Sequence, residues 1–265
     1  MIATDPIAAL RPPLKWAGGK RWQVPHLRSL WQAHRHRRLV EPFCGGLAVA
    51  LGLRPAVALL NDANPHLINF YRWLQRGLVI ELAMRNHAAS FYRYRARFNA
   101  LLAAGRGDSV EAASLFYYLN RTGYNGLCRF NRSGGFNVPF GRYSSIPYVR
   151  DFREYAAALS GWTFTSGDVE AVALEPDDFV YADPPYDVEF TAYAQGGFSW
   201  ADQERTAVRL ASHPGPVVLV NQATPRVEAL YGALGYSLSY LDAPRRISCN
   251  GDRRRAREIV ATLHT

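Results

Sequence analysis

The chain has 265 residues, of which 48% are hydrophobic, enough for a substantial core in one large domain or in one domain with an insertion. Its net charge of +9 and isoelectric point of about 9.7 favour a polyanionic partner. Cys44, Cys128 and Cys249 lie far apart with no histidine cluster nearby, which argues against a disulfide framework and a zinc site and fits a reducing cytoplasm. The sequence has no apolar run of membrane-spanning length and no N-terminal signal pattern, so we expect a cytoplasmic protein without a membrane partner.

Both lysines of the chain lie in the first motif, Leu14-Lys15-Trp16-Ala17-Gly18-Gly19-Lys20, before an amphipathic helix expected at about 21–34. Two glycines before a helix let backbone N–H groups approach an anion. Trp16 can form a wall against a flat ligand, and Lys20 can neutralise a carboxylate. A plain glycine turn into a helix explains the glycines equally well.

A strand, a glycine loop and a short helix are expected next, over residues 38 to 53, followed by a strand over 57–62. Phe43 and Gly45 belong to the loop, and Asp62 ends the second strand. This layout holds a nucleoside ribose by its hydroxyl groups. Leu47 stands where a dinucleotide fingerprint has a further glycine, which favours a smaller nucleoside ligand. The alternative for Asp62 is a strand-end cap.

Residues 65 to 120 interrupt the alternation of strands and helices and therefore indicate an inserted domain. Helical spacing of apolar residues predicts helices at 66–76, 79–86, 91–104 and 110–119. Three arginines at 93, 95 and 97 suggest a basic surface, although a solvated helix face explains them as well.

Residues 120 to 143 interleave Asn, Arg and aromatic side chains with glycines, and segments 127–131 and 136–140 are predicted to pair as a hairpin. Arg can bond guanine and Asn can bond adenine through two atoms each, and exposed aromatic rings can wedge into an opened base stack. A structural hairpin with surface arginines is the alternative. The Arg, Asn and Tyr candidates for contact with DNA here are Arg121, Tyr124, Asn125, Arg129, Asn131, Arg142 and Tyr143.

The rest of the chain returns to an alternating pattern. We expect a helix over 148–160, a strand over 163–168 that ends in Asp168, and a mobile lid over 187–198. Ser199 and Asp202 fit a capping pair. The remaining predicted elements are helices over 200–212 and 225–234 and strands over 216–220, 236–241 and 257–263. An arginine-rich loop over 245–255 lies between the last two strands and is either a phosphate contact or a solubilising turn.

The motif with the clearest chemistry is Asp183-Pro184-Pro185-Tyr186, which follows a short apolar strand at 179–181. Pro cannot continue a sheet ladder, so the strand ends there, at the edge where ligands bind in open α/β sheets. The Asp183 carboxylate and the Pro184 carbonyl can both accept hydrogens of an exocyclic amine on a nucleobase, which makes its nitrogen nucleophilic. Pro184 and Pro185 stiffen the turn, and a base can stack on Tyr186. The alternative is a strand stop with a surface tyrosine.

Together these motifs resemble the Dam-type adenine-N6 DNA methyltransferases of the alpha group, in the same order and over nearly the whole chain. The segments that carry the resemblance are 14–20, 41–43, 61–64, 120–143 and 183–186. The resemblance implies a Rossmann-like α/β fold with a mostly parallel seven-stranded sheet, an antiparallel last strand and an inserted helical target-recognition domain that carries a β-hairpin. It predicts a catalytic domain over 1–64 and 147–265 and a target-recognition domain over 65–146.

The resemblance also implies S-adenosylmethionine as methyl donor, no metal, and adenine N6 in double-stranded DNA, with GATC as the expected site. It assigns base reading to Leu127, Arg129 and Pro139, probing of the stack to Tyr124, and a contact at the outer edge of the site to Lys15. We expect a monomer. The residues expected to bind the donor are Trp16, Lys20, Phe43, Gly45, Asp62, Asp168 and Asp183.

Three alternatives stay open from the sequence. The first is a methyltransferase for cytosine N4 or for RNA. The second is a dinucleotide-dependent oxidoreductase, which the incomplete glycine fingerprint disfavours. The third is a DNA-binding regulator that shares the fold and transfers no methyl group.

Overall fold

The structure is a computed structural model that describes residues 10–187, 198–243 and 256–265. The predicted lid falls almost entirely on 188–197 and the predicted arginine-rich loop on 244–255, so both lie outside the described residues. The chain divides into two compact units. The first comprises Met1–Arg21, Gly45–Arg54 and Asn64–Ser166, and the second comprises Trp22–Cys44, Pro55–Ala63 and Gly167–Thr265. The target-recognition domain over 65–146 stays a prediction.

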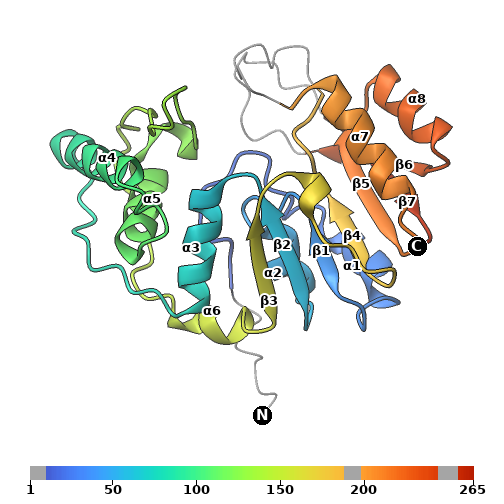
Figure 1. Cartoon of the computed structure of the whole chain (residues 1–265), viewed down its shortest axis with the longest axis horizontal. Helices are drawn as coiled ribbons and strands as arrows, with labels where there is room; N and C mark the ends of the chain where they lie inside the picture. Colours follow the sequence, from blue (N-terminus) through green and yellow to red (C-terminus); the bar gives the residue numbers. More distant parts are fainter. Residues whose placement is uncertain (1–9, 188–197, 244–255) are drawn as a thin grey trace. The chain divides into compact units, whose positions relative to one another are not determined.

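Seven strands form a mixed sheet in the order β3-β2-β1-β4-β5-β7-β6 (Figure 1). Six of them belong to the second unit: β1 (Leu39–Glu41), β2 (Ala58–Asp62), β4 (Phe179–Ala182), β5 (Val217–Gln222), β6 (Ser237–Ala243) and β7 (Ala256–Leu263). β2, β1, β4 and β5 pair in parallel, whereas β7 runs antiparallel to both of its neighbours. The predicted Rossmann-like sheet with an antiparallel last strand is therefore confirmed.

The central strands are short, continuous apolar runs, as expected for parallel strands that are buried on both faces. All residues of β1 and β4 are buried, and Val40 lies opposite Val180 in the register. The edge strand β6 instead alternates between exposed and partly buried residues. The sheet is thus most deeply buried at β1 and β4, where the predicted catalytic turn begins.

Three helices complete the second unit: α1 (Val24–Gln32), α7 (Trp200–Ala211) and α8 (Pro225–Ala233). The predicted capping pair of α7 is confirmed, because the Asp202 N–H donates to the Ser199 hydroxyl at 3.2 Å and the Ser199 N–H donates to the Asp202 carboxylate at 2.7 Å. Ala207 and Leu210 of α7 and Val227 of α8 are fully buried in the core cluster of the sheet.

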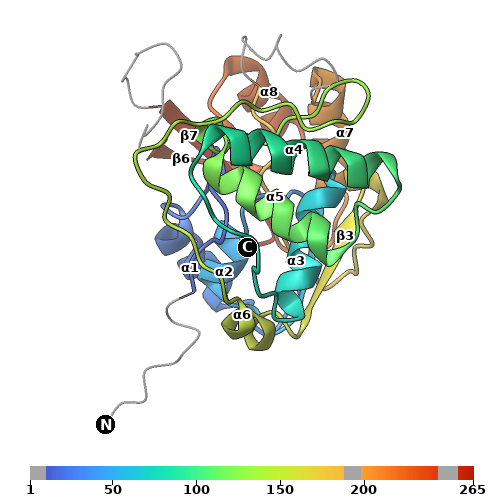
Figure 2. The ribbon, with the colours of Figure 1, turned by 90° about the vertical axis from the view of Figure 1, so that its left-hand side faces the viewer.

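The first unit is mainly helical (Figure 2). Its elements are α2 (Ala48–Leu53), α3 (Pro65–Gln75), α4 (Ala88–Ala103), α5 (Val110–Thr122), the 3₁₀ turn η2 (Tyr124–Gly126), α6 (Arg153–Ala158) and β3 (Trp162–Ser166). α5 is buried along most of its length and packs against α3 and α4. Phe70 of α3 stacks on Tyr117 of α5 with ring centroids 5.6 Å apart, so aromatic side chains form much of this core.

Two predicted helical segments of this unit are wrong. Residues 79–86 form no helix, and α6 begins only at Arg153 instead of residue 148. The two segments pair with each other instead, because the Ile80 N–H donates to the Arg150 carbonyl at 2.7 Å and the Phe152 N–H donates to the Leu78 carbonyl at 2.9 Å. Long-range pairing therefore satisfies backbone groups that helical spacing had assigned to local bonds.

The predicted hairpin reverses the chain as expected, but its arms are not regular strands. A single bridge joins Phe130 to Phe136, and the Asn131 N–H donates to the Gly135 carbonyl at 2.9 Å across the turn. α4 anchors the returning arm, because the Asn99 amide donates to the Phe136 carbonyl at 3.1 Å and accepts from the Phe136 N–H at 2.8 Å. Hydrogen bonds between the Asn99 side chain and the Phe136 backbone thus take the place of part of the strand-to-strand ladder that a regular hairpin would have.

Candidate functional site

The sheet order reverses between β1 and β4, which is where ligands bind in open α/β folds. The chain leaves β1 toward β2 on one side and leaves β4 toward β5 on the other. Because these strands are parallel, their carboxyl ends meet at one edge of the sheet. The structure therefore brings Phe43, Asp62 and Asp183, which follow or end β1, β2 and β4, to the same edge of the second unit.

The Asp-Pro-Pro-Tyr turn begins directly after β4. Asp183 and Tyr186 are half-buried, Pro184 is buried and Pro185 is exposed. Burial raises the pKa of the Tyr186 phenol, and the negative charges of Asp183 and Glu258 raise it further. The Tyr186 phenol is therefore uncharged at neutral pH.

A buried asparagine, Asn61, joins the loops at this edge. Its side-chain amide donates to the Pro42 carbonyl and to the Gly167 carbonyl, both at 3.0 Å. Its main-chain carbonyl accepts from the Cys44 N–H at 2.8 Å. The carboxyl ends of β1 and β2 and the turn before Asp168 are thereby held together. Asn61 belongs to the 61–64 segment that carries the resemblance, but this supporting role was not predicted. The available signal was an amide directly before a strand-end acid.

Asp168 is engaged by the protein itself. Arg205 of α7 donates to its two carboxylate oxygens at 2.5 and 2.6 Å, and one of these oxygens caps η3 (Val169–Ala171) by accepting from the Glu170 N–H at 2.9 Å. The bonds to Arg205 and to the Glu170 N–H lower the pKa of Asp168 from 3.8 to about 2. A contact between Asp168 and the expected methyl donor would therefore share the carboxylate with Arg205.

Asp168→Asn is expected to keep the cap and to lose the ion pair. Because the folded state lowers the pKa of Asp168, the pair stabilises the protein above pH 3.8, and this contribution is lost as the pH falls toward about 2. Both side chains are partly exposed, so the loss in unfolding free energy at pH 6 is at most about 1 kcal/mol. Urea unfolding of the wild type and of Asp168→Asn between pH 6 and pH 3 measures how this loss in unfolding free energy depends on pH. A difference that stays constant over this range would contradict the assignment.

The predicted donor-binding glycine loop lies in the first unit with Trp16. An added Cβ at Gly45 or at Gly46 would come within 2.8 Å of Trp16 atoms, so only glycine allows the indole to lie this close. Leu47 follows in the left-handed region with φ of 59°, fully buried at the N-terminus of α2. A residue without a Cβ adopts this conformation most easily, which explains why glycine was the expected residue there. Lys20 is buried, and its Nζ donates to the Gly18 carbonyl at 2.9 Å.

Three of the predicted DNA-contacting residues, Lys15, Arg121 and Tyr143, lie together in the first unit. Lys15 Nζ donates to the Arg121 carbonyl at 3.1 Å and lies 3.6 Å from the centroid of the Tyr143 ring. Burial, followed by the nearby charge of Arg121, lowers the pKa of Lys15. Asn120 holds this arrangement in place, since it accepts from the Lys15 N–H at 2.9 Å and donates to the Lys15 carbonyl at 2.8 Å. Asn120 was not among the predicted site residues.

Other candidates in the 120–143 segment present their side chains to solvent. Tyr124 is 50% exposed and Leu127 is 37% exposed. Asn125 adopts a left-handed conformation with φ of 51° between them. Pro139 and Arg142 are exposed as well. The side chains of these residues are accessible to a partner, and their contact with DNA stays a prediction.

Arg129 and Asn131 differ in how much of their side chains the hairpin uses. Arg129 is exposed, and its Nε donates to the Asn137 side chain at 2.8 Å, which braces the guanidinium against the returning arm of the hairpin. Asn131 accepts from the Gly135 N–H at 2.7 Å and from the Ser133 hydroxyl at 2.8 Å. The Asn131 oxygen therefore closes the turn, and its contact with DNA stays a prediction.

A buried polar cluster in the second unit was missed by sequence reasoning. Glu258 of β7 accepts from the Gln23 amide at 2.6 Å, and Gln23 accepts from the Tyr181 hydroxyl at 3.0 Å. All three side chains are buried. Glu258 also interacts with the Tyr186 phenol, so the cluster reaches both sides of the Asp-Pro-Pro-Tyr turn. A glutamate within an apolar strand was the available signal.

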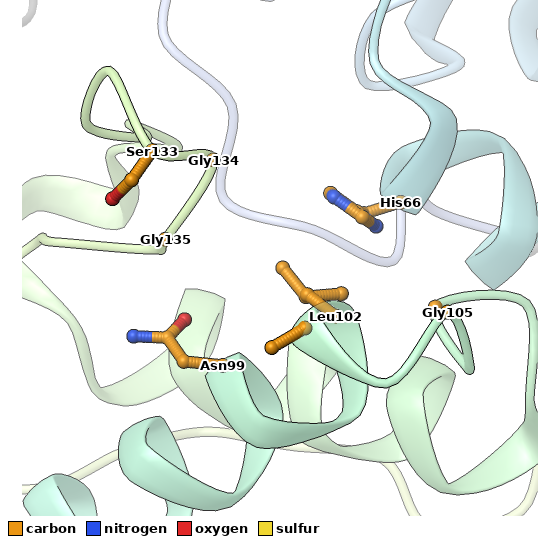
Figure 3. A pocket seen from close by; sticks show the side chains of 9 residues that line it. His66, Asn99, Leu102, Gly105, Ser133, Gly134 and Gly135 are labelled. Carbon is orange, nitrogen blue, oxygen red and sulfur yellow. The ribbon is translucent and has the colours of Figure 1, made fainter.

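A pocket of about 370 Å³ lies in the first unit, between the hairpin turn and the connection from α4 to α5 (Figure 3). His66, Asn99, Leu102 and Ser133 line it together with glycines of both turns. The lining has no charged group, since burial lowers the pKa of His66 and favours its neutral ring. No predicted site residue lines this pocket.

The described residues contain no helix that is both long and apolar enough to cross a membrane. Within the same residues, no group of three or more His, Cys, Asp or Glu side chains is arranged to hold a metal ion. That the reaction needs no metal stays a prediction.

The second unit thus has a Rossmann-like sheet with an acid, two prolines and an aromatic ring at its switch point, which defines the class of α/β proteins that bind nucleoside ligands. Residues 16–247 match the model of the D12 class N6 adenine-specific DNA methyltransferase family, and the chain belongs to this family. The resemblance inferred from the sequence is confirmed. Membership implies S-adenosylmethionine as methyl donor and DNA as substrate.

Curated relatives match over nearly the full chain. The chain is 36% identical to the retron Ec67 DNA adenine methylase of Escherichia coli, over 94% of this chain and 90% of the relative. It is 37% identical to a DNA adenine methylase of Vibrio cholerae, over 95% of both. It is 34% identical to the type II methyltransferase M1.LlaDCHI of Lactococcus lactis subsp. cremoris, over 96% of this chain and 95% of the relative.

Among solved structures, a putative RNA methyltransferase from Pyrococcus horikoshii aligns with a TM-score of 0.41 and 10% sequence identity, over 97% of this chain and 92% of the other. Similarity at this level carries no argument about the substrate.

Proposed function

We propose that this methyltransferase transfers a methyl group from S-adenosylmethionine to N6 of an adenine flipped out of double-stranded DNA, with GATC as its site, and that it acts as a monomer. The observation that carries the proposal is the Asp-Pro-Pro-Tyr turn at the carboxyl end of β4, where the sheet order reverses. The choice of GATC rests on the resemblance of the 120–143 segment to Dam-type enzymes.

The catalytic roles fall to four consecutive residues. The Asp183 carboxylate and the Pro184 carbonyl accept hydrogen bonds from the two N–H groups of the adenine amine, so that its lone pair is directed at the methyl group. The N–C bond forms as the S–C bond breaks, and the methylated nitrogen then releases one of its two protons to solvent. Pro184 and Pro185 have fixed φ angles, which keeps these acceptors aimed without reorganisation during the reaction. The flipped base stacks on the neutral ring of Tyr186, which offsets part of the few kcal/mol that unstacking costs.

The donor supplies a methyl group on a positively charged sulfur, which leaves as a neutral thioether. The proposed binding residues fit this molecule. Asp62 is a half-buried acid at the end of β2 and suits the ribose hydroxyls, while the ring of Phe43 suits the adenine. Lys20 and the loop at Gly45 suit the carboxylate, and Trp16 forms a flat wall. Asp168 and Asp183 add negative charge, which favours a cationic donor.

The roles proposed for DNA recognition follow the exposure of the side chains. Tyr124, Leu127 and Pro139 are exposed apolar groups suited to contact with bases, and Arg129 is the bidentate donor for guanine. Lys15, Arg121, Arg142 and Tyr143 are proposed to contact the backbone or the outer bases of the site. Asn125 and Asn131 are proposed as polar contacts of the same segment.

Methylation of plasmid DNA tests this function. The purified protein is incubated with plasmid and labelled S-adenosylmethionine, and the DNA is digested to nucleosides. N6-methyladenine is the expected product, and single-molecule mapping of modified bases is expected to find it at GATC. N4-methylcytosine, or label only in added RNA, would overturn the choice of base or of nucleic acid. N6-methyladenine at another sequence would overturn GATC alone.

Arg129→Ala is expected to reduce discrimination at one guanine of the site by about 1–3 kcal/mol, because a bidentate contact to a base edge is lost. The measurement compares kcat/KM on duplexes with the intact site and with that guanine replaced. Arg132→Ala is the matched control, because Arg132 is an exposed arginine of the same hairpin turn. Equal weakening of all duplexes by Arg129→Ala would identify Arg129 as a phosphate contact instead.

A further inference from the structure

The two peptide groups on either side of Tyr186 are bonded to buried side chains. Gln203 of α7 donates from Nε2 to the Pro185 carbonyl at 2.6 Å, and Asn221 of β5 accepts at Oδ1 from the Asp187 N–H at 3.3 Å. The polypeptide is therefore gripped immediately before and immediately after the tyrosine. Prolines cannot supply such anchors through their own nitrogens, since they have no N–H.

The two gripping side chains also hold each other. Asn221 Nδ2 donates to Gln203 Oε1 at 3.0 Å and lies 3.1 Å from the Tyr231 hydroxyl, while the Gln222 N–H donates to Asn221 Oδ1 at 2.8 Å. Gln203 is 3% exposed and Asn221 is fully buried. Because the Gln203 oxygen accepts from Asn221, its nitrogen has to face the Pro185 carbonyl, so the network has one consistent orientation.

The chain beyond Tyr186 is fixed in the same way. The Asp187 carboxylate pairs with Arg226 of α8, and the Arg226 guanidinium lies 4.6 Å from the centroid of the Trp200 ring. The Asp187 side chain is only 9% exposed. Two helices and one strand thus converge on the segment that carries the tyrosine ring.

We infer that Gln203 and Asn221 are positioning residues for methyl transfer, which hold the ring of Tyr186 in the plane where the flipped adenine stacks. The inference rests on the proposed function, in which Tyr186 stacks on the base and Asp183 accepts from its amine. A shift of the ring by about 1 Å moves the amine away from line with the methyl group, and misplacement of this size costs about 100-fold in rate. The inference gives neither side chain a contact with the base, because both are buried and bonded within the protein.

Gln203→Leu tests this role, because leucine has a similar volume and cannot donate to the Pro185 carbonyl. We expect kcat for methyl transfer to fall about 10- to 100-fold, while KM for S-adenosylmethionine changes less than about 2-fold. Thr206→Val is the matched control: Thr206 is buried one turn further along α7, and its hydroxyl has no hydrogen-bond partner within the described part of the chain. Thr206→Val is expected to leave kcat unchanged. An unchanged kcat in Gln203→Leu would overturn the inference.

A double-mutant cycle separates positioning from general support. In a Tyr186→Ala background no ring remains to be held, so Gln203→Leu is expected to cause little further loss in single-turnover rate. The same fractional loss in both backgrounds would show that Gln203 acts without the ring and would overturn the inference. Failure of the proposed function is seen separately, because the wild-type protein would then form no N6-methyladenine in the same assay.

Discussion

Replacement of Asp183 by Asn is expected to lower kcat for methyl transfer by at least about 100-fold while DNA affinity stays within about 2-fold. The asparagine keeps the shape of the side chain and loses its negative charge. Removal of one preorganised electrostatic group from an active site typically costs about 10²- to 10³-fold in rate. Asp183 is the first residue after the buried strand β4 and is followed by two prolines, so the backbone that carries this charge is held on both sides.

Single-turnover transfer of labelled methyl groups gives the rate, and fluorescence anisotropy with a labelled duplex gives the DNA affinity. Asp177→Asn is the matched control, since Asp177 lies just before the other end of β4 and its side chain is 97% exposed beside Arg37. This control loses the same charge and is expected to retain full activity. Near-normal turnover in Asp183→Asn would remove the basis of the mechanism. Parallel loss in both variants would instead indicate a general effect of charge.

The parts of the fold that sequence reasoning predicted correctly are those with local causes. The apolar run at 179–181 had to end at Pro184, because proline cannot continue a ladder, and β4 ends at Ala182. The capping pair of α7 was predicted correctly for the same kind of reason, since its two bonds join residues three apart. Asp62 ends one predicted strand and Asp183 follows another, so the sequence also predicted correctly that these two acids lie at one edge of a parallel sheet.

The parts that sequence reasoning missed depend on distant partners. Residues 79–86 have helical spacing, yet the Ile80 N–H donates to the Arg150 carbonyl, 70 positions away, and the neighbouring Leu78 carbonyl accepts from the Phe152 N–H. Asn120 bonds to the backbone of Lys15 across 105 positions, and Gln203 bonds to that of Pro185 across 18. A polar side chain inside an apolar segment marks such a residue, but the sequence does not name the peptide group it satisfies.

Sequence reasoning also treated all polar side chains of the 120–143 segment alike, whereas the structure divides them. Asn131 uses its oxygen to close the hairpin turn, while Arg129 is exposed and braced by Asn137. The composition of the segment predicts contact with DNA as a whole and does not assign it to single residues. Only coordinates separate the residues that build the hairpin from those that it presents, because both groups consist of Asn and Arg.

Gly126→Ala is expected to lower the free energy of unfolding by about 2–4 kcal/mol and to weaken DNA binding. Gly126 has a φ of +64°, which costs a residue with a Cβ about 1 kcal/mol. The added Cβ would also come within 2.4 Å of the Lys15 Cβ and 3.1 Å of the Lys15 carbonyl oxygen, and such overpacking costs about a further 1–3 kcal/mol. Asn120 bonds to both segments, donating to the Gly126 carbonyl at 3.3 Å, so Lys15 cannot move aside freely.

Gly134→Ala separates these two costs. Gly134 has a similar φ of +77°, but an added Cβ there meets no atom within 4 Å. Its variant is expected to lose only the conformational part, about 1 kcal/mol. Urea unfolding of the three proteins measures the difference, and anisotropy with a duplex measures the binding. Equal destabilisation by the two variants would mean that Lys15 does not lie against Gly126 in solution, and its proposed place at the edge of the DNA site would lose its structural support.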